Sequence, residues 1–149
     1  MRKSLFEPGA AASIVSRLES IPHDRPAKFG TLTAPKMICH LRDSFRAALG
    51  EVPVKPKNTP MKNPVMRWLV IDSPIPWPKG APTAPEFLAT RPADWDADRV
   101  DARQLLERLA ARGPSADWPE HPAFGRMPGA QWGRLLYRHT DHHLRQFGV

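Results

Sequence analysis

The sequence predicts an all-α protein: one domain built as a small helical bundle with one long crossover connection. Four segments place apolar residues at helical spacing, and the alternation of apolar and polar residues typical of strands is nowhere sustained. Between Pro53 and Pro92 the prolines are too frequent for one long helix. The 149 residues are enough for one hydrophobic core.

The first two helices are expected over residues 10–21 and 34–50. The first has an apolar residue every three or four positions and stops at Pro22. The second has Thr33 as a suitable N-cap, and Gly50 is a plausible stop at its C-terminus.

The last two helices are expected over residues 97–112 and 128–147. Asp96 can cap the first of these. Pro128 suits the first position of the final helix, and Gly148 suits its end. The final helix has the most regular pattern of the four.

Residues 51–96 form the crossover. A connection of this length in a small domain is usually functional or packed as a lid. Within it, residues 66–71 are either a short helix or a buried extended run, and periodicity does not decide between them. Trp68 and Trp77 are candidates for the core, for a lid or for an interface.

Composition narrows the class of protein. With 41% apolar and 25% charged residues the chain is typical of soluble globular proteins, and Cys39 is its single cysteine, which excludes an internal disulfide and indicates a reducing compartment. No signal peptide and no apolar run of about 20 residues is present, so we expect a cytoplasmic protein without a membrane partner. The net charge of +7 is spread over the chain without a recognition motif, so nucleic acid is not an expected partner.

The final helix carries an unusual pair of histidines. At 100° per residue, His139 and His143 share one face with Gln146 and with the apolar residues Trp132, Leu135 and Leu136. The opposite face, which we expect to be exposed to solvent, carries Arg134, Arg138, Asp141 and Arg145. Two inward imidazoles one turn apart need partners for their ring nitrogens, and a metal ion bound by both would provide one.

A metal needs a third ligand, and His40 on the second helix is the best candidate. Three imidazoles leave coordination positions open, as in catalytic or ligand-binding sites, and suit a divalent transition metal such as Zn, Ni or Fe. We expect His23 and His121, which lie among prolines in loops, to be solvated.

Four further residues are expected to support or line this site: Asp43, Gln146, His142 and Trp132. Asp43 lies three residues after His40. It would either bind the unused ring nitrogen of a ligand or pair with Arg42 or Arg46 on the surface. His142, at the edge of the inward face, is a surface residue, a supporting group or a ligand.

Several motifs together resemble a known superfamily. Residues 121–125 (HPAFG) and 131–148 (QWGRLLYRHTDHHLRQFG) resemble the C-terminal signature of an uncharacterised branch of the DinB-like superfamily. Residues 37–44 (MICHLRDS) resemble its first ligand helix, and residues 76–86 (PWPKGAPTAPE) resemble a motif of the branch.

The resemblance implies an antiparallel four-helix bundle with the long connection between its second and third helices. It also implies a metal site of His40, His139 and His143 at one end of the bundle, with Gln146 matching a glutamine one turn further on. The usual Thr or Ser cap of the last helix is replaced here by Met127, Pro128 and Gly129, which weakens the cap by about 1 kcal/mol.

Two functions follow as expectations. DinB-like proteins include enzymes that use low-molecular-weight thiols, such as bacillithiol transferases and mycothiol-dependent isomerases, as well as members without a known activity. We therefore expect a metal-dependent transferase or hydrolase that acts on a small molecule, with a low-molecular-weight thiol as a candidate co-substrate. The alternative is a non-catalytic module that binds a metal or small ligand as a homodimer. A zinc-protease mechanism is disfavoured because Asp141, between the paired histidines, points outward.

Overall fold

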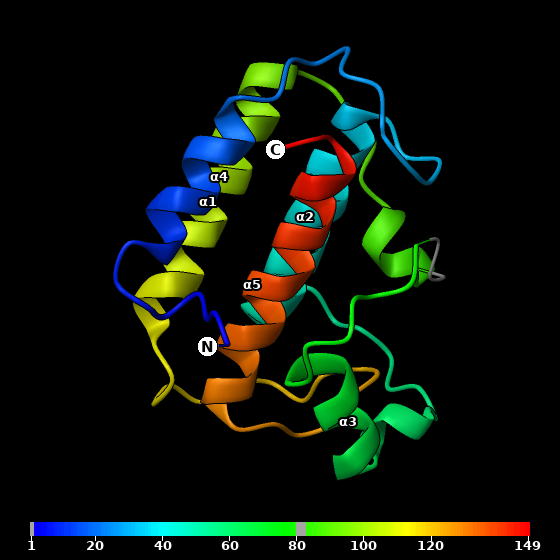
Figure 1. Cartoon of the computed structure of the whole chain (residues 1–149), viewed down its shortest axis with the longest axis vertical. Helices are drawn as coiled ribbons and strands as arrows, with labels where there is room; N and C mark the ends of the chain where they lie inside the picture. The colour runs from blue at the N-terminus through cyan, green and yellow to red at the C-terminus, as the bar shows by residue number, and fades with distance from the viewer. Residues whose placement is uncertain (1, 80–82) are drawn as a thin grey trace.

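In the computed structural model, which describes residues 2–79 and 83–149, the described chain is all-helical (Figure 1). It contains five α-helices: α1 (Ala10–Glu19), α2 (Ala34–Ala48), α3 (Pro64–Ile71), α4 (Trp95–Arg112) and α5 (Gly129–Gln146). Two short 3-10 helices, η1 (Pro60–Lys62) and η2 (Pro85–Leu88), lie in the crossover. The predicted all-α class is confirmed. Residues 80–82 of the 76–86 motif lie outside the described part.

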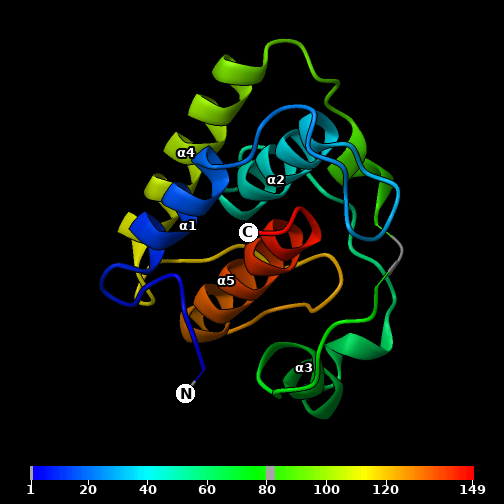
Figure 2. The same cartoon turned by 45° about the horizontal axis from the view of Figure 1, so that its top comes forward.

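The four longer helices surround the core. α1 lies beside α4, and α5 lies beside α2, while α3 lies at one end of the molecule, where it contacts α5 (Figures 1 and 2). α2 packs along α4, and α1 contacts both α4 and α5. Fully buried side chains come from each of these helices, among them Leu18, Phe45, Leu109 and Leu144. No described helix is both long enough and apolar enough to span a membrane.

The helix ends follow local capping chemistry. The Thr33 hydroxyl accepts a hydrogen bond from the Lys36 amide, as expected of the N-cap of α2. α4 begins two residues earlier than predicted because Asp94, rather than Asp96, is its cap and accepts from the Ala97 amide. Pro128 precedes α5 instead of occupying its first turn, and no side chain caps that helix.

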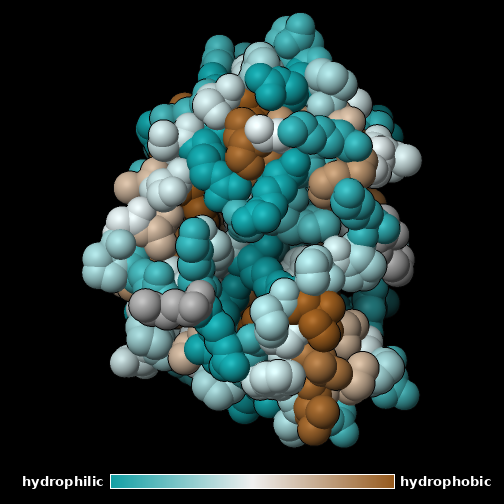
Figure 3. All heavy atoms as spheres, in the orientation of Figure 1, coloured by the Kyte–Doolittle hydropathy of each residue, from teal (hydrophilic) through white to brown (hydrophobic). Residues whose placement is uncertain are grey.

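The crossover contains more helix than periodicity could establish. The segment 66–71 belongs to α3, which Asn63 caps by accepting from the Val65 amide. In the space-filling view most of the visible face is hydrophilic, and hydrophobic spheres gather where α3 lies (Figure 3). Trp68 of α3 is 43% exposed, so it does not fill the core, whereas Trp77 is half-buried.

The expected solvent face of α5 is largely covered, which corrects the prediction. Arg134 forms an ion pair with the buried Asp72, and Arg138 donates hydrogen bonds to backbone carbonyls of residues 71–75. Asp141 pairs with Arg17 of α1. Only Arg145 among these four residues is well exposed, with 72% of its side chain accessible. The cause is tertiary: the crossover and α1 pack on a face that a helical projection assigns to solvent.

Candidate metal centre

Three histidines from two helices converge at one point of the molecule. His40 comes from α2, and His139 and His143 come from successive turns of α5. The ring centroids lie 5.0 Å apart for His40 and His139, 4.6 Å for His40 and His143, and 4.8 Å for the α5 pair. One possible ligand atom from each ring lies within 4.8 Å of the others, so this group could hold a metal ion.

Hydrogen bonds fix which nitrogen of His40 faces the other rings. Its Nδ1 lies 2.8 Å from the carbonyl oxygen of Phe87. A carbonyl can only accept, so Nδ1 carries the proton and donates it. The Nε2 of His40 therefore keeps its lone pair, and this atom lies 3.0 Å from the Nε2 of His139. An imidazole oriented in this way is prepared to bind a metal through Nε2.

The same logic applies to His143, through Gln146. The Gln146 amide nitrogen donates to the Phe29 carbonyl at 2.9 Å, which fixes the orientation of the side-chain amide. Its Oε1 then faces His143 Nδ1 at 2.9 Å and accepts a proton from it. His143 thus also has a free lone pair on Nε2.

The loop before α2 approaches this end of α5 very closely. The Lys28 amide donates to the Gln146 carbonyl at 2.7 Å. Gly30 follows with φ of +76°, and a Cβ at that position would lie 2.6 Å from Nε2, the side-chain amide nitrogen of Gln146. A glycine is required here both for the backbone conformation and for the space that Gln146 occupies.

Burial keeps all three imidazoles neutral at physiological pH. It is the main cause that lowers the pKa of His40 and of His139, the latter to well below its ordinary value. It also lowers the pKa of His143 to about 3, with repulsion from His40 adding to the effect. Neutral rings offer lone pairs rather than protons, which is the state that metal binding requires.

The rim of the histidine cluster is aromatic. The Trp77 ring lies 6.1 Å from His139 and 5.8 Å from His142, and its Nε1 donates to the Val70 carbonyl. The Phe29 ring also lies 5.5 Å from His142. His142 is thus a half-buried rim residue next to two aromatic rings, outside the group of three that converges. Burial lowers its pKa.

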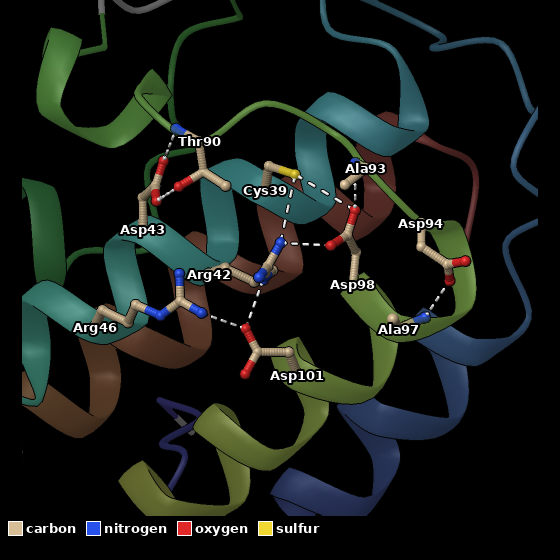
Figure 4. Close-up of polar contacts among 10 residues, drawn as sticks. All are labelled: Cys39, Arg42, Asp43, Arg46, Thr90, Ala93, Asp94, Ala97, Asp98 and Asp101. Atoms are coloured by element: carbon tan, nitrogen blue, oxygen red, sulfur yellow. Dashed lines mark hydrogen bonds and ion pairs between the residues drawn. The ribbon is translucent and has the colours of Figure 1, made fainter.

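Asp43 makes neither of the two contacts expected for it. Its carboxylate accepts from both the amide and the hydroxyl of Thr90 in the crossover (Figure 4). Arg42 pairs instead with Asp98 and Asp101 of α4, and Asp101 also binds Arg46. Asp43 faces the crossover, whereas the two arginines reach across to α4. The Nδ1 of His40 is hydrogen-bonded instead to the backbone carbonyl of Phe87. Every residue has a backbone carbonyl, so the sequence cannot reveal this partner.

Two aromatic residues lie elsewhere than predicted. Trp132 stacks on Trp118 at 5.3 Å, two turns of α5 before His139, and so belongs to the core rather than to the histidine cluster. His121, expected in solvent, is half-buried beside Trp132, and burial lowers its pKa to about 4. Its Nδ1 accepts from the amides of Ala123 and Phe124, so it closes a tight turn. His23 is exposed, as expected.

Sequence reasoning did not single out the Phe29 and Phe87 carbonyls, which hydrogen-bond to the supporting residues of the histidine cluster.

Comparison with known proteins places the chain in a family: it belongs to DUF1569, a protein family of unknown function, whose profile matches residues 15–148. Neither the curated proteins nor the solved structures give a significant match.

Proposed function

We propose that the protein binds one divalent transition metal through the Nε2 atoms of His40, His139 and His143. The observation that carries the proposal is the pair of hydrogen bonds from Nδ1, to Phe87 and to Gln146, which leaves Nε2 of His40 and of His143 free to bind a metal, within a group whose possible ligand atoms lie within 4.8 Å of one another. Two of these neutral imidazoles are buried and one is half-buried, and neutral rings offer lone pairs that a cation can bind. Zinc, nickel and iron all suit this donor set.

We further propose that the fold is a DinB-like four-helix bundle formed by α1, α2, α4 and α5. In support, the long connection falls between α2 and α4, and the histidines come from the second and last of the four helices. Both features match the resemblance drawn from the motifs around His40 and His139.

A metal-dependent enzyme that uses a small molecule, with a thiol as co-substrate, is the activity that these residues support best. With three protein ligands, coordination positions remain for a water, a thiol or a carbonyl group, and a bound metal would lower the pKa of such a water or thiol. The carboxylates nearest in sequence are engaged elsewhere: Asp43 with Thr90, and Asp141 with Arg17. A metal-bound thiolate is itself the nucleophile, so it needs no dedicated carboxylate base.

The same engagement of Asp43 and Asp141 favours a second candidate, a non-catalytic module that binds a metal or a small ligand. Turnover separates the two. Metal-loaded protein would be assayed with low-molecular-weight thiols and small electrophiles, against metal-free protein and the His139→Ala variant. Metal-dependent turnover supports the enzyme, and its absence with every thiol supports the module.

Metal content tests the proposed site itself. Protein purified without a polyhistidine tag is expected to carry close to one transition-metal ion per chain, as measured by plasma mass spectrometry. His139→Ala should lose most of it. His23→Ala, which removes an exposed histidine outside the cluster, is the matched control and should retain it. Equal metal content in the two variants would refute the site.

A further inference from the structure

Two contacts run side by side between α2 and the end of the crossover. His40 donates to the Phe87 carbonyl, and Asp43 accepts from Thr90. Residues three apart on a helix lie on neighbouring turns of one face. Both contacts also join residues 47 positions apart in the chain. The segment 87–90 therefore lies along α2 in a single register, fixed at each end by one of the two contacts.

Besides His40, two side-chain contacts among the described residues hold residues 86–90, and that of Asp43 is the stronger. The Asp43 carboxylate is buried, with only 8% exposure, and it takes two hydrogen bonds from one residue, the amide of Thr90 at 3.0 Å and its hydroxyl. Hydrogen bonds to a charged acceptor are stronger than neutral ones. The other tie, between Glu86 and Lys57 at 3.6 Å, joins side chains that are 31% and 39% exposed. Exposed pairs of this kind contribute little.

We propose that Asp43 and Thr90 are positioning residues of the metal centre, which hold the Phe87 carbonyl in place and so fix the ring of His40 with Nε2 toward the other histidines. The role of Asp43 is therefore indirect: it acts through the crossover, and the carbonyl that it positions binds the imidazole. The inference rests on the proposed function for its consequence in metal binding, but the orientation of His40 exists without metal.

The energetic consequence follows from the geometry. η2 is a single short 3-10 helix without a side-chain cap, so little within it fixes the Phe87 carbonyl. If the Thr90 contact is lost, the carbonyl moves and the Nδ1 proton of His40 loses its acceptor. The ring is then free to take the other tautomer, in which Nε2 carries the proton and cannot bind a metal through that atom. Loss of such supporting contacts typically weakens metal binding about 10-fold to 100-fold.

The test compares two substitutions of the same residue. Thr90→Val removes the hydroxyl but keeps the size of the side chain, the backbone amide and the charge of Asp43. Thr90→Ser keeps the hydroxyl and is the matched control. In metal-free protein, ¹⁵N NMR of the histidine side chains should show His40 protonated at Nδ1 in wild type and Thr90→Ser. Thr90→Val should show a mixture of the two tautomers.

Zinc affinity, measured by competition with a chromophoric chelator, gives the second measurement. Thr90→Val is expected to bind zinc about 10-fold more weakly than wild type, and Thr90→Ser within about twofold. Asp43→Ala should weaken binding at least as much as Thr90→Val, and the double variant should be no worse than Asp43→Ala, because both changes break one contact. Additive losses in the double variant would contradict the proposal.

The two proposals fail in different ways. If wild type binds no zinc but Thr90→Val still alters the tautomer of His40, the positioning role stands and the metal centre is refuted. If wild type binds zinc and Thr90→Val changes neither tautomer nor affinity, the positioning role is refuted and the metal centre stands. Circular dichroism and thermal unfolding of each variant establish that it is folded, and Asp43→Ala, which breaks the same contact, carries the comparison if Thr90→Val is not folded.

Discussion

The Nε2 atoms of His40 and His139 lie 3.0 Å apart, although the residues are 99 positions apart in the chain. Because Nδ1 of His40 holds its proton against the Phe87 carbonyl, the proton between the two rings belongs to His139. In metal-free protein His139 therefore donates to His40. A metal bound by both Nε2 atoms would displace that proton to Nδ1 of His139. The two Nε2 atoms are thus hydrogen-bonded to each other without metal, and both would bind the ion when metal is present.

Gly30→Ala is predicted to damage the metal centre although residue 30 is not a ligand. The new Cβ would meet the Gln146 amide nitrogen at 2.6 Å, and Gln146 would have to leave His143 and the Phe29 carbonyl. We expect zinc binding to weaken about 10-fold, because His143 loses the acceptor that fixes its tautomer. Competition with a chelator measures the change.

Gly50→Ala is the matched control for that experiment. Gly50 has φ of +77°, close to the +76° of Gly30, but a Cβ there meets no atom of residues 2–79 or 83–149 within 4 Å. Both variants should lose about 1–2 kcal/mol of unfolding free energy from backbone strain. Only Gly30→Ala should lose zinc affinity. Equal affinities in the two variants would show that Gln146 does not support the site.

Arg138→Met is predicted to loosen the segment that carries Trp77. Arg138 donates to backbone carbonyls of Ile71, Ser73 and Ile75, and its guanidinium lies 5.6 Å from the Trp77 ring. We expect a loss of about 1–3 kcal/mol of unfolding free energy, because several carbonyls lose their donor. Limited trypsin digestion should also cut faster after Lys79.

Arg145→Met provides the comparison. Arg145 is on the same helix, its side chain is 72% exposed, and its ion-pair partner among the described residues is Asp141 one turn away. Its loss should change the unfolding free energy by at most about 0.5 kcal/mol and leave digestion at Lys79 unchanged. The interpretation of Arg138 fails if the two variants are equally stable and equally resistant to digestion.

Acid is predicted to destabilise the metal-free protein through His121. Burial holds its pKa at about 4, below the ordinary value near 6.5, so the folded state binds fewer protons than the unfolded state between these values. The stability that the neutral ring contributes is fully present above pH 6.5 and is lost as the pH falls toward 4. The expected slope from this one residue is at most about 1.4 kcal/mol per pH unit.

His121→Asn isolates that contribution. Its side-chain oxygen can accept from the amides that now bind Nδ1 of His121, but it does not titrate. Urea unfolding of metal-free protein at pH 7.5 and pH 5 should show a smaller loss of stability for the variant than for wild type. Identical losses would mean that His121 is not a buried neutral group.

Local patterns predicted the helices well because each pattern is set within a few residues. The 3.6-residue period placed His139 and His143 on one inward face of α5, and Thr33 capped α2 as its type suggests. The period could not show that Arg138 is covered, because the cover is a proline-rich crossover without periodicity of its own.

The contacts that orient the histidines were beyond sequence reasoning for a different reason. The partner of His40 is the backbone carbonyl of Phe87, and every residue has a carbonyl. Spacing associated Asp43 with His40, but the residue that Asp43 contacts is Thr90, and that contact depends on the path of the crossover. Residue types reveal which groups have the chemistry for a site, whereas the supporting backbone depends on tertiary packing.

Titration of metal-free protein with zinc by calorimetry at pH 7.5 tests the central claim most directly. Wild type and His23→Ala should each bind one equivalent with the same affinity, and His40→Ala, His139→Ala and His143→Ala should each bind at least about 100-fold more weakly. No saturable binding of one equivalent by wild type, or binding that survives all three substitutions, would contradict the account.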